Sequence, residues 1–264
     1  MLNYKPIALN GKPVADAKFP LICTPLVGRT LTDILTELDL VLPKKPDVLE
    51  WRVDYFEGIV DTALVISVAK AIKTAANGIP LLFTRRSIME GGERIALNED
   101  QVVALYSAVC ASKHIDLIDY EMVNDAANIA WVREAAHANG ISLVLSFHNF
   151  KCTPEQETLV GKFITAERLG ADIAKVAVMP NDPDDVLTLL SATQQASGQV
   201  QIPVISMSMG SYGALTRLFG WVYGSALTFA VGACGSAPGQ MPIEDLSTVL
   251  NILKKSAPPD SDGP

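Results

Sequence analysis

Short runs of apolar and β-branched residues recur along the chain, and amphipathic helical patterns separate them. The runs begin about 25–35 residues apart, which is the length that a strand and a following helix need together. Their continuous apolar character is typical of parallel strands that helices cover on both faces. The eight candidate strands cover residues 20–24, 48–54, 80–86, 116–121, 142–148, 173–179, 203–209 and 225–231.

The segments between these runs carry apolar residues at helical spacing. Gly140, Gly170 and Gly198 lie where three of the helices are expected to end, because glycine readily adopts the left-handed conformation that closes a helix. The clearest helical patterns cover residues 31–40, 61–76, 99–112 and 124–139.

Eight successive strand–helix units predict a (β/α)₈ TIM barrel that occupies residues 1–254 as a single α/β domain. An Asn10-Gly11 pair between apolar residues predicts an N-terminal β-hairpin over about residues 4–15, which we expect to close the bottom of the barrel. Residues 255–264 are rich in Pro, Asp and Ser, a composition that predicts a disordered C-terminal tail.

Composition and charge narrow the class of protein. Hydrophobic residues make up 49% of the 264 residues, which is enough for one large core. The net charge of −8 argues against a nucleic acid partner, since binding phosphate requires a basic face. We find no segment with the length of a membrane span and no secretory signal, so we expect a soluble cytoplasmic protein.

The four cysteines, at positions 23, 110, 152 and 234, are widely scattered. Their spacing fits neither a disulfide framework nor a zinc site. The three histidines are equally scattered, so that metal-dependent hydrolysis is poorly supported. The cysteines and histidines therefore give no support for a metal site.

Charged residues interrupt or end several of the apolar runs. Active sites of barrels lie at the carboxyl ends of the strands, and burying a charge is costly unless it is paired or used. Any one of these residues could instead face the helices or form an ion pair at the bottom of the barrel. They are Glu50, Arg52, Arg85, Arg86, Asp119, Glu121, His148 and Lys175.

Lys175 lies inside an apolar run and shares one face with Ile173, Ala177 and Met179 if the residues alternate strictly. Desolvation lowers the pKa of a lysine, and the neutral amine can then attack a ketone to form an imine. The alternative is a lysine that crosses the barrel to pair with a carboxylate.

His148 ends the run immediately before the one that carries Lys175, so both side chains are expected to reach one substrate. Its pKa suits a group that takes up a proton and returns it. A histidine that merely packs or caps is the alternative. His114 and His137 fall between helices and strands and are expected at the surface.

Two loops complete the candidate site. Residues 86–92 supply Arg86 and Glu90, and residues 232–240 follow the last strand and are rich in small residues. The second loop could cradle a phosphate, as loops at this place in barrels often do. It could equally be a mobile lid that brings Ser236 and Gln240 over a polyhydroxylated substrate.

The sequence resembles type I 3-dehydroquinate dehydratase, the Schiff-base-forming dehydratase of the shikimate pathway, over nearly the whole chain. Any one block of similar residues is weak, but their order along the chain is highly specific. The blocks are 22–25, 50–54, 83–87, 90–92, 116–119, 146–150, 175–180, 206–210 and 236–240. Asn149 stands where many members have Asp, and Arg85 stands where Phe is common.

The resemblance implies a dimeric barrel, without metal or cofactor, that converts 3-dehydroquinate to 3-dehydroshikimate by syn elimination of water. Lys175 would form the imine, His148 would transfer the protons, and Glu90 would orient the imidazole ring. Arg217 would clamp the substrate carboxylate. The other residues expected to bind substrate are Glu50, Arg52, Arg86, Ser236, Gln240, Thr24, Met207 and Phe229.

Two other functions share parts of this pattern. A class I aldolase or lyase that acts on another keto acid would also use Lys175 on a barrel strand, but it would not need Glu90, His148, Arg217 and Gln240 together. A barrel that only binds a ligand would form no covalent adduct.

Overall fold

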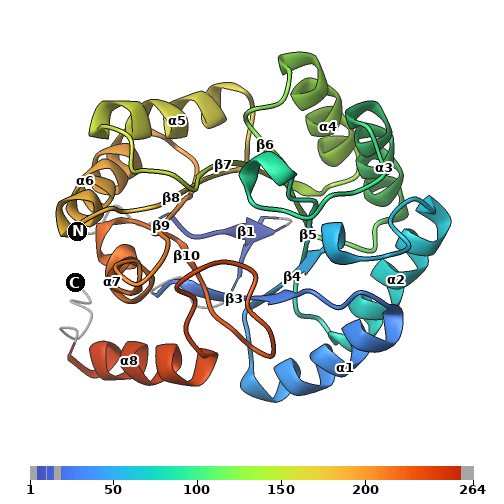
Figure 1. Cartoon of the computed structure of the whole chain (residues 1–264), viewed down its shortest axis with the longest axis horizontal. Helices are drawn as coiled ribbons and strands as arrows, with labels where there is room; N and C mark the ends of the chain where they lie inside the picture. Colours follow the sequence, from blue (N-terminus) through green and yellow to red (C-terminus); the bar gives the residue numbers. More distant parts are fainter. Residues whose placement is uncertain (1–4, 10, 15–18, 257–264) are drawn as a thin grey trace.

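The computed structural model describes residues 5–9, 11–14 and 19–256. In this part of the chain eight parallel strands form one sheet that curls into a barrel, and helices surround it (Figure 1). The barrel predicted from the apolar runs is therefore confirmed. In spatial order the strands are β10 (Leu227–Phe229), β3 (Leu21–Leu26), β4 (Val48–Arg52), β5 (Leu81–Thr84), β6 (Leu117–Glu121), β7 (Ser142–Asn149), β8 (Ile173–Val178) and β9 (Val204–Ser208).

The helices are α1 (Leu31–Val41), α2 (Thr62–Ala75), α3 (Glu99–Ser112), α4 (Ala126–Ala138), α5 (Gln156–Arg168), α6 (Pro183–Gln199), α7 (Ala214–Phe219) and α8 (Ile243–Ser256). The four helices for which the sequence predicts limits, α1 to α4, begin and end close to those limits. Gly140 and Gly170 follow helices and have φ of 72° and 85°, as expected. The prediction for Gly198 is wrong, because α6 continues to Gln199 and a single glycine does not stop a helix whose other residues pack well.

Side chains alternate between the inside and the outside of the barrel, as the pleat of a strand requires. On β8, Ile173 and Ala177 pack in the cluster inside the barrel. Ala174, Val176 and Val178 pack in the cluster between the sheet and the helices. Lys175 lies between Ile173 and Ala177 in the alternation, so it points inward.

The inward residues form layers along the barrel axis. The layer nearest the amino ends of the strands is apolar and contains Val48, Leu82, Leu117, Val144, Ile173, Ile205 and Leu227. Two residues further along the same strands the layer becomes polar and contains Glu50, Thr84, Asp119, Ser146, Lys175, Met207 and Phe229. The barrel thus separates a packed floor from a polar upper half.

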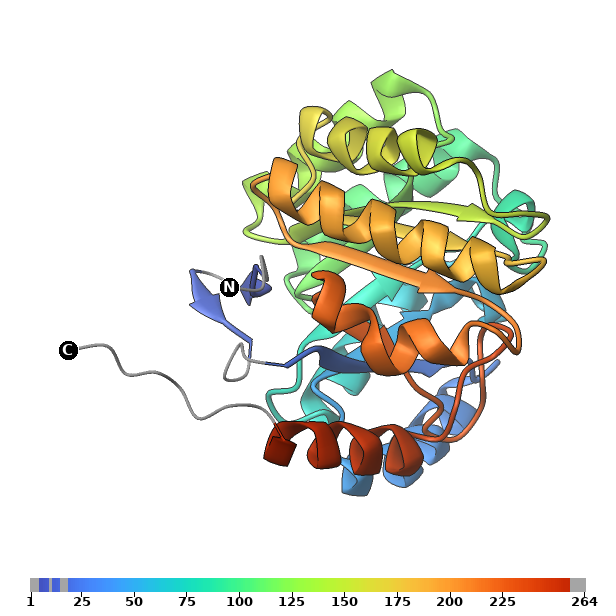
Figure 2. The same ribbon diagram turned by 90° about the vertical axis from the view of Figure 1, so that its left-hand side faces the viewer.

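An N-terminal hairpin lies under the floor. Its strands β1 (Ala8–Leu9) and β2 (Lys12–Pro13) pair antiparallel, while Asn10 of the predicted turn lies outside the described residues. Ile7 is only 2% exposed and packs in the cluster inside the barrel. Figure 2 shows the hairpin at the end of the barrel where the strands begin, as expected.

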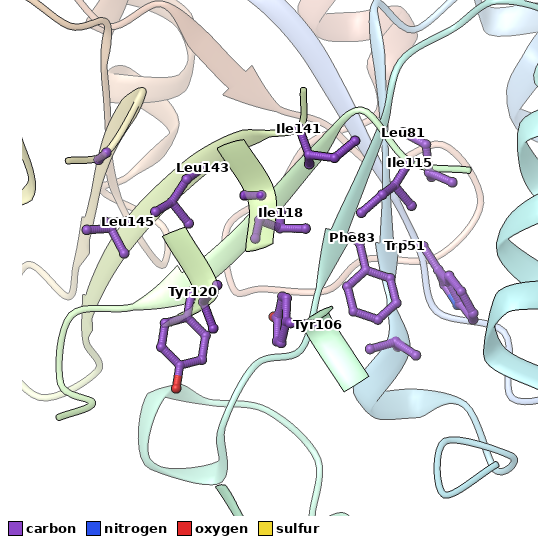
Figure 3. Packing of buried hydrophobic residues seen from close by; sticks show 14 of the residues in the cluster. Trp51, Leu81, Phe83, Tyr106, Ile115, Ile118, Tyr120, Ile141, Leu143 and Leu145 are labelled. Carbon is purple, nitrogen blue, oxygen red and sulfur yellow. The ribbon is translucent and has the colours of Figure 1, made fainter. Parts of the chain in front are cut away.

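Between the sheet and the helices, four aromatic rings form a row (Figure 3). Trp51, Phe83, Tyr106 and Tyr120 contact one another edge-on, with ring centroids 5.4–5.6 Å apart. The Tyr106 hydroxyl donates to the backbone oxygen of Asp119 at 2.6 Å and accepts from the backbone N–H of Arg85 at 3.0 Å. The row therefore fixes the carboxyl ends of β5 and β6, which lead into the polar layers.

The barrel closes between β9 and β10 through few bonds. Val204 and Ser225 form a single parallel bridge, and the Ala226 N–H donates to the Val204 oxygen at 2.8 Å. The Ser206 N–H donates at 3.0 Å to the hydroxyl of Ser225, a side chain that replaces a backbone acceptor. β10 is a short strand of three residues. We call its junction with β9 the seam of the barrel, and Ser225 completes the hydrogen bonds of this seam.

We expect Ser225→Ala to lower the free energy of unfolding by about 1–3 kcal/mol, because the buried Ser206 N–H loses its acceptor. Urea denaturation followed by far-UV circular dichroism measures the change. Ser67→Ala, which removes an exposed hydroxyl from a helix, is the control and should stay within about 0.5 kcal/mol of the parent protein. Equal stability of the Ser225 variant would show that the seam does not need the hydroxyl.

Helix α8 ends at Ser256, and the remainder of the predicted C-terminal tail lies outside the described residues. Within the described residues, no helix combines the length and the apolar character that crossing a membrane demands.

Candidate active site

The polar upper half of the barrel contains a cavity of about 430 Å³, counted to its open mouth. All the predicted site residues except Thr24 and Arg217 line it. The lining residues are Glu50, Arg52, Arg86, Glu90, Gly91, His148, Phe150, Lys175, Ala177, Met207, Met209, Phe229, Ser236, Ala237 and Gln240. They come from five strands, β4, β7, β8, β9 and β10, and from the segments that follow β5, β7, β9 and β10, so the barrel gathers residues that are far apart in the sequence.

Lys175 lies at the base of this cavity and is only 4% exposed. Its Nζ atom donates to Asp119 Oδ2 at 2.9 Å and lies 3.9 Å from Glu50 Oε1. The ring of Phe229 covers the same nitrogen, with its centroid 4.6 Å away. The sequence left open a desolvated amine that forms an imine or a lysine that pairs with a carboxylate. In the structure Lys175 is buried and also pairs with a carboxylate, that of Asp119 on β6, two strands away.

His148, on the neighbouring strand β7, forms a pair with Glu90. His148 Nδ1 lies 2.8 Å from Glu90 Oε2, and the two side chains are 9% and 5% exposed. This contact leaves Nε2 as the ring nitrogen free to act on a substrate. The sequence prediction that Glu90 orients His148 is consistent with this geometry.

Burial changes the pKa values of both groups. Burial, followed by the positive charges of Arg86 and Lys175, lowers the pKa of His148 well below its ordinary value. Burial, followed by the negative charge of Glu121, raises the pKa of Glu90 to about 8. Near neutral pH the histidine is thus uncharged, and the carboxyl group of Glu90 is largely protonated.

A short 3₁₀-helix, η3 (Ile88–Glu90), brings Glu90 to His148. Gly91 ends this helix with φ of 83°, in the left-handed region. A Cβ atom at Gly91 would lie 2.3 Å from the ring of Phe150, so that only glycine fits here. The Glu-Gly-Gly sequence is therefore a requirement of the loop that positions Glu90.

Two arginines of the cavity are held by carboxylates. Arg52 makes a bidentate pair with Asp54, at 2.8 and 2.7 Å. Arg86 donates to Asp119 at 2.8 Å and to Glu121 at 3.1 Å. Both guanidinium groups are therefore fixed before any ligand binds.

Arg217 differs from these arginines. It is 1% exposed and donates only to neutral acceptors, the backbone oxygens of Phe229 at 3.3 Å and Pro238 at 3.2 Å and the sulfur of Met207 at 3.9 Å. Burial lowers its pKa to about 10, so it stays charged at neutral pH. It lies directly behind Met207 and Phe229, with a positive charge that no carboxylate among the described residues balances.

The loop of residues 232–240 lies across the mouth of the cavity. Ser236 donates from its backbone N–H to Gln240 Oε1 at 2.8 Å, and its backbone oxygen accepts from Arg52 at 3.3 Å. A Cβ atom on Gly239 would lie 2.1 Å from the backbone oxygen of Gly210, so that the loop can approach β9 only with glycine at this place. The placement of Ser236 and Gln240 fits a covering loop.

Thr24 lies outside the cavity. Its methyl group lies beside Gly232, where an added Cβ would approach it to 2.5 Å. In the strand alternation it shares the outward face of β3 with Ile22 and Leu26, which pack against the helices. The structure therefore places Thr24 beneath the covering loop rather than on the cavity wall.

Sequence reasoning did not assign a role to Asp119, Asp54, Glu121 or Ser146. All four are at most 4% exposed and hold the arginines and the lysine of the site. Asp119 and Glu121 are two residues apart on β6, so alternation alone could have placed both inside the barrel. No sequence pattern tells which cation faces them from another strand.

The two departures from the family pattern lie beside the site. Asn149 Oδ1 accepts from the backbone N–H groups of Lys151 at 2.9 Å and Cys152 at 3.2 Å, bonds that an aspartate would also make. Arg85 donates to Glu99 at 2.6 Å between the sheet and the helices. Within the described residues, the structure contains no cluster of three or more side chains that could hold a metal ion.

A buried lysine beside a histidine–carboxylate pair, in one cavity at the carboxyl end of a parallel barrel, defines a (β/α)₈-barrel enzyme. Residues 22–257 match the family described as Type I 3-dehydroquinase, and the chain belongs to this family.

Individual relatives agree with this assignment. The chain is 70% identical over 256 residues to a 3-dehydroquinate dehydratase of Albidiferax ferrireducens, with 97% of each chain covered. The crystal structure of 3-dehydroquinate dehydratase from Geobacillus kaustophilus superposes with a TM-score of 0.94 at 47% identity, covering 98% of this chain and 100% of that one. The type I 3-dehydroquinate dehydratase of Clostridium difficile, solved with covalently modified comenic acid, gives 0.91 at 36% identity, covering 96% and 100%.

Proposed function

We propose that this chain removes water from 3-dehydroquinate by syn elimination to give 3-dehydroshikimate, through an imine on Lys175. The observation that carries the proposal is the buried lysine at the base of a cavity that the His148–Glu90 pair also lines. The names of the relatives, which are 3-dehydroquinate dehydratases, support the choice of substrate.

Imine formation begins with the transfer of one proton from the Lys175 ammonium to His148. The neutral amine then adds to the C3 ketone of the substrate. His148 returns the proton to the hydroxyl of the carbinolamine, which leaves as water. The product of this step is a positively charged iminium, so the charge on the nitrogen is the same before and after.

The iminium then serves as the electron sink for elimination. His148 Nε2 removes the proton from C2, and the resulting enamine expels the C1 hydroxyl, which takes the same proton from His148 and leaves as water. Because one base delivers both proton transfers, both groups depart on the same face of the ring. Addition of water to the product iminium releases 3-dehydroshikimate and the Lys175 ammonium.

The remaining polar groups bind the substrate. Arg217 carries an unbalanced positive charge and would clamp the carboxylate once it exchanges its bonds to the backbone oxygens of Phe229 and Pro238 for bonds to the substrate. Glu50, Arg52 and Arg86 would bind the ring hydroxyls. Ser236 and Gln240 would close from the covering loop, and Met207 and Phe229 would line the apolar part of the pocket. Thr24 would act only indirectly, by supporting the loop at Gly232.

The covalent route is tested by incubating the protein with 3-dehydroquinate, reducing with borohydride and locating the added mass by peptide mapping. We expect an adduct of the mass of reduced 3-dehydroshikimate on Lys175. Samples without substrate and without borohydride are the controls.

Each other outcome points to a different function. An adduct that has not lost water, with no formation of the conjugated product, would favour an aldolase or a lyase of another keto acid. Binding of 3-dehydroquinate without an adduct would leave a barrel that only binds the ligand, and would contradict the imine.

The pH dependence of catalysis should depend on Glu90. His148 can act as a base only when Glu90 is ionised and accepts the Nδ1 proton, since a protonated Glu90 leaves a proton on Nε2 instead. We expect kcat/KM to rise with pH up to about 8, the pKa of Glu90, because kcat/KM reports ionisations of the free enzyme.

In Glu90→Gln the side-chain oxygen accepts the Nδ1 proton at every pH, so we expect the acid limb of the profile to move to lower pH. Initial rates between pH 5 and 9, followed by the absorbance of the conjugated product, measure both profiles. An acid limb at the same pH in the variant and the parent protein would contradict this assignment.

We propose also that the chain works as a homodimer, as the family resemblance implies, and that it is located in the cytoplasm, as expected from the sequence patterns. Exposed apolar side chains on neighbouring elements, Leu187 of α6, Leu215 of α7 and Val222 of the 3₁₀-helix η4 (Gly220–Tyr223), support an interface between copies. Sedimentation velocity tests the dimer, and a species of monomer mass at micromolar concentration would contradict it.

A further inference from the structure

Asp119 is a fully buried carboxylate for which the steps above give no use. It lies on β6, is 0% exposed and does not line the cavity. Each of its oxygens is held: Ser146 donates to Oδ1 at 2.6 Å, and Arg86 and Lys175 donate to Oδ2 at 2.8 and 2.9 Å. A substrate in the cavity cannot reach it, so any effect of Asp119 on the reaction passes through its partners.

Asp119 balances the charge of Lys175 rather than that of Arg86, because Arg86 has a second carboxylate partner. Arg86 also pairs with Glu121, which accepts from it at 3.1 Å and contacts no other positively charged side chain among the described residues. Glu50 is further from the lysine nitrogen, at 3.9 Å, and its nearer oxygen already accepts from Thr84 at 2.9 Å. Asp119 therefore makes the closest ionic contact with Nζ within the described part of the barrel.

We propose that Asp119 is the fixed counterion of the Lys175 nitrogen, first as the ammonium and then as the iminium. The proposal rests on the proposed function, since it concerns the imine. Lys175 enters the covalent intermediate by exchanging two N–H bonds for one C=N bond, while the released oxygen leaves as water. The nitrogen carries one positive charge on both sides of this exchange, and a carboxylate that cannot move or be displaced by substrate neutralises it throughout.

The counterion has a definite chemical consequence. The iminium withdraws electrons from C2 only while it is protonated, and a neighbouring negative charge favours the protonated form. Burial alone would raise the pKa of Asp119, but the charges of Arg86 and Lys175 outweigh burial and lower it. Asp119 thus remains ionised wherever the enzyme is folded and active.

Other groups also face the lysine nitrogen, and the pH behaviour of the imine includes their effects. Glu50 of β4 lies 3.9 Å from Nζ, and His148 of β7 and the thiol of Cys23 on β3 interact electrostatically with the lysine. Arg52, Arg86 and Glu90 line the same cavity, and Glu121 of β6 pairs with Arg86. Burial raises the pKa of Cys23 well above its ordinary value, so the thiol stays neutral. Among the described residues, only Asp119 combines ionisation with a hydrogen bond to Nζ.

The test uses Asp119→Asn, which keeps the shape of the side chain and removes its charge. The enzyme is mixed with 3-dehydroquinate, and the rate of reduction by cyanoborohydride, which reduces iminium ions and not neutral imines, is measured from pH 6 to 9.5. Mass spectrometry confirms the site. In the parent protein we expect reduction to continue to the alkaline end of this range, after correction for the reagent.

In Asp119→Asn we expect the pH at which the reduction rate falls to be at least about one unit lower than in the parent protein. The loss of an adjacent opposite charge predicts this shift. On the falling limb this corresponds to about a tenfold slower reduction at the same pH. Glu121→Gln is the matched control, since it removes another buried carboxylate from the same strand and from the same arginine without touching Nζ. The pH profile of reduction in Glu121→Gln should shift much less than that of Asp119→Asn, whatever the effect of this variant on turnover.

A profile of Asp119→Asn that superposes on the parent profile would overturn the counterion role, and so would an equal shift in Glu121→Gln. If Asp119→Asn does not fold, the parent protein alone still decides, because an iminium that loses its proton below pH 8 is not held by a permanent counterion. Absence of any adduct in the parent protein is a different result, which contradicts the proposed function itself.

Discussion

Lys175→Met is expected to abolish the covalent adduct and to reduce turnover by roughly 10⁴- to 10⁶-fold, as the loss of a covalent nucleophile does in other enzymes. Methionine keeps an unbranched side chain under the ring of Phe229, one heavy atom shorter than lysine, and has no amine to form an imine. The measurements are product formation by absorbance and peptide mapping after borohydride treatment.

The variant also separates chemistry from folding. Without Lys175, Asp119 keeps its bonds to Arg86 and Ser146, so that the buried carboxylate is not left without a partner. We therefore expect Lys175→Met to fold, which far-UV circular dichroism checks. Lys162→Met is the control, since this lysine lies on the outside of the barrel against Phe147 and should leave the rate unchanged. Substantial turnover by Lys175→Met would refute the imine.

His148→Ala is expected to slow turnover by about 10²- to 10⁴-fold, the usual contribution of a general acid–base group. The amine of Lys175 remains in place, so the adduct should still form on long incubation, but with the mass of reduced 3-dehydroquinate because elimination is blocked. Rates and adduct masses from the same samples give the two parts of the result.

His137→Ala is the matched control for this variant. His137 lies on α4 and contacts Asp172 at the surface, with 44% of its side chain exposed, and its loss should leave turnover within twofold. Rates of His148→Ala close to those of the parent protein would remove the proposed role of His148. An adduct that has already lost water would assign the elimination to another group.

Much of the fold could be predicted from the sequence because its signals are local. Apolar runs at regular spacing give the strands, and the alternation within 173–179 places Lys175 inside the barrel. The seam was less predictable. The run 225–231 reads as one strand, but only Leu227–Phe229 pair regularly. At the start of the run the hydroxyl of Ser225 takes the place of a backbone acceptor, and at its end Val231 forms a bridge with Pro242 instead.

The site was predicted from a resemblance and from the positions of charges in the strands, but the partners of those charges were not. Asp119 meets Lys175 from another strand, and only the stagger of the barrel brings the two together. The same holds for Arg217, whose contacts with Pro238 and Phe229 depend on how the last loop folds back. Periodicity within one strand contains no information on such contacts.

The apolar floor limits how water can take part in the reaction. The small void beneath Lys175 is lined, apart from the lysine itself, by apolar side chains such as Ile7, Leu117 and Leu227. Water that hydrolyses the product imine must therefore enter by the mouth through which substrate arrives and product leaves. Because substrate, water and product share one opening, the steps must follow a fixed order. The covering loop must admit water while the product is still bound as the imine, before the product can leave.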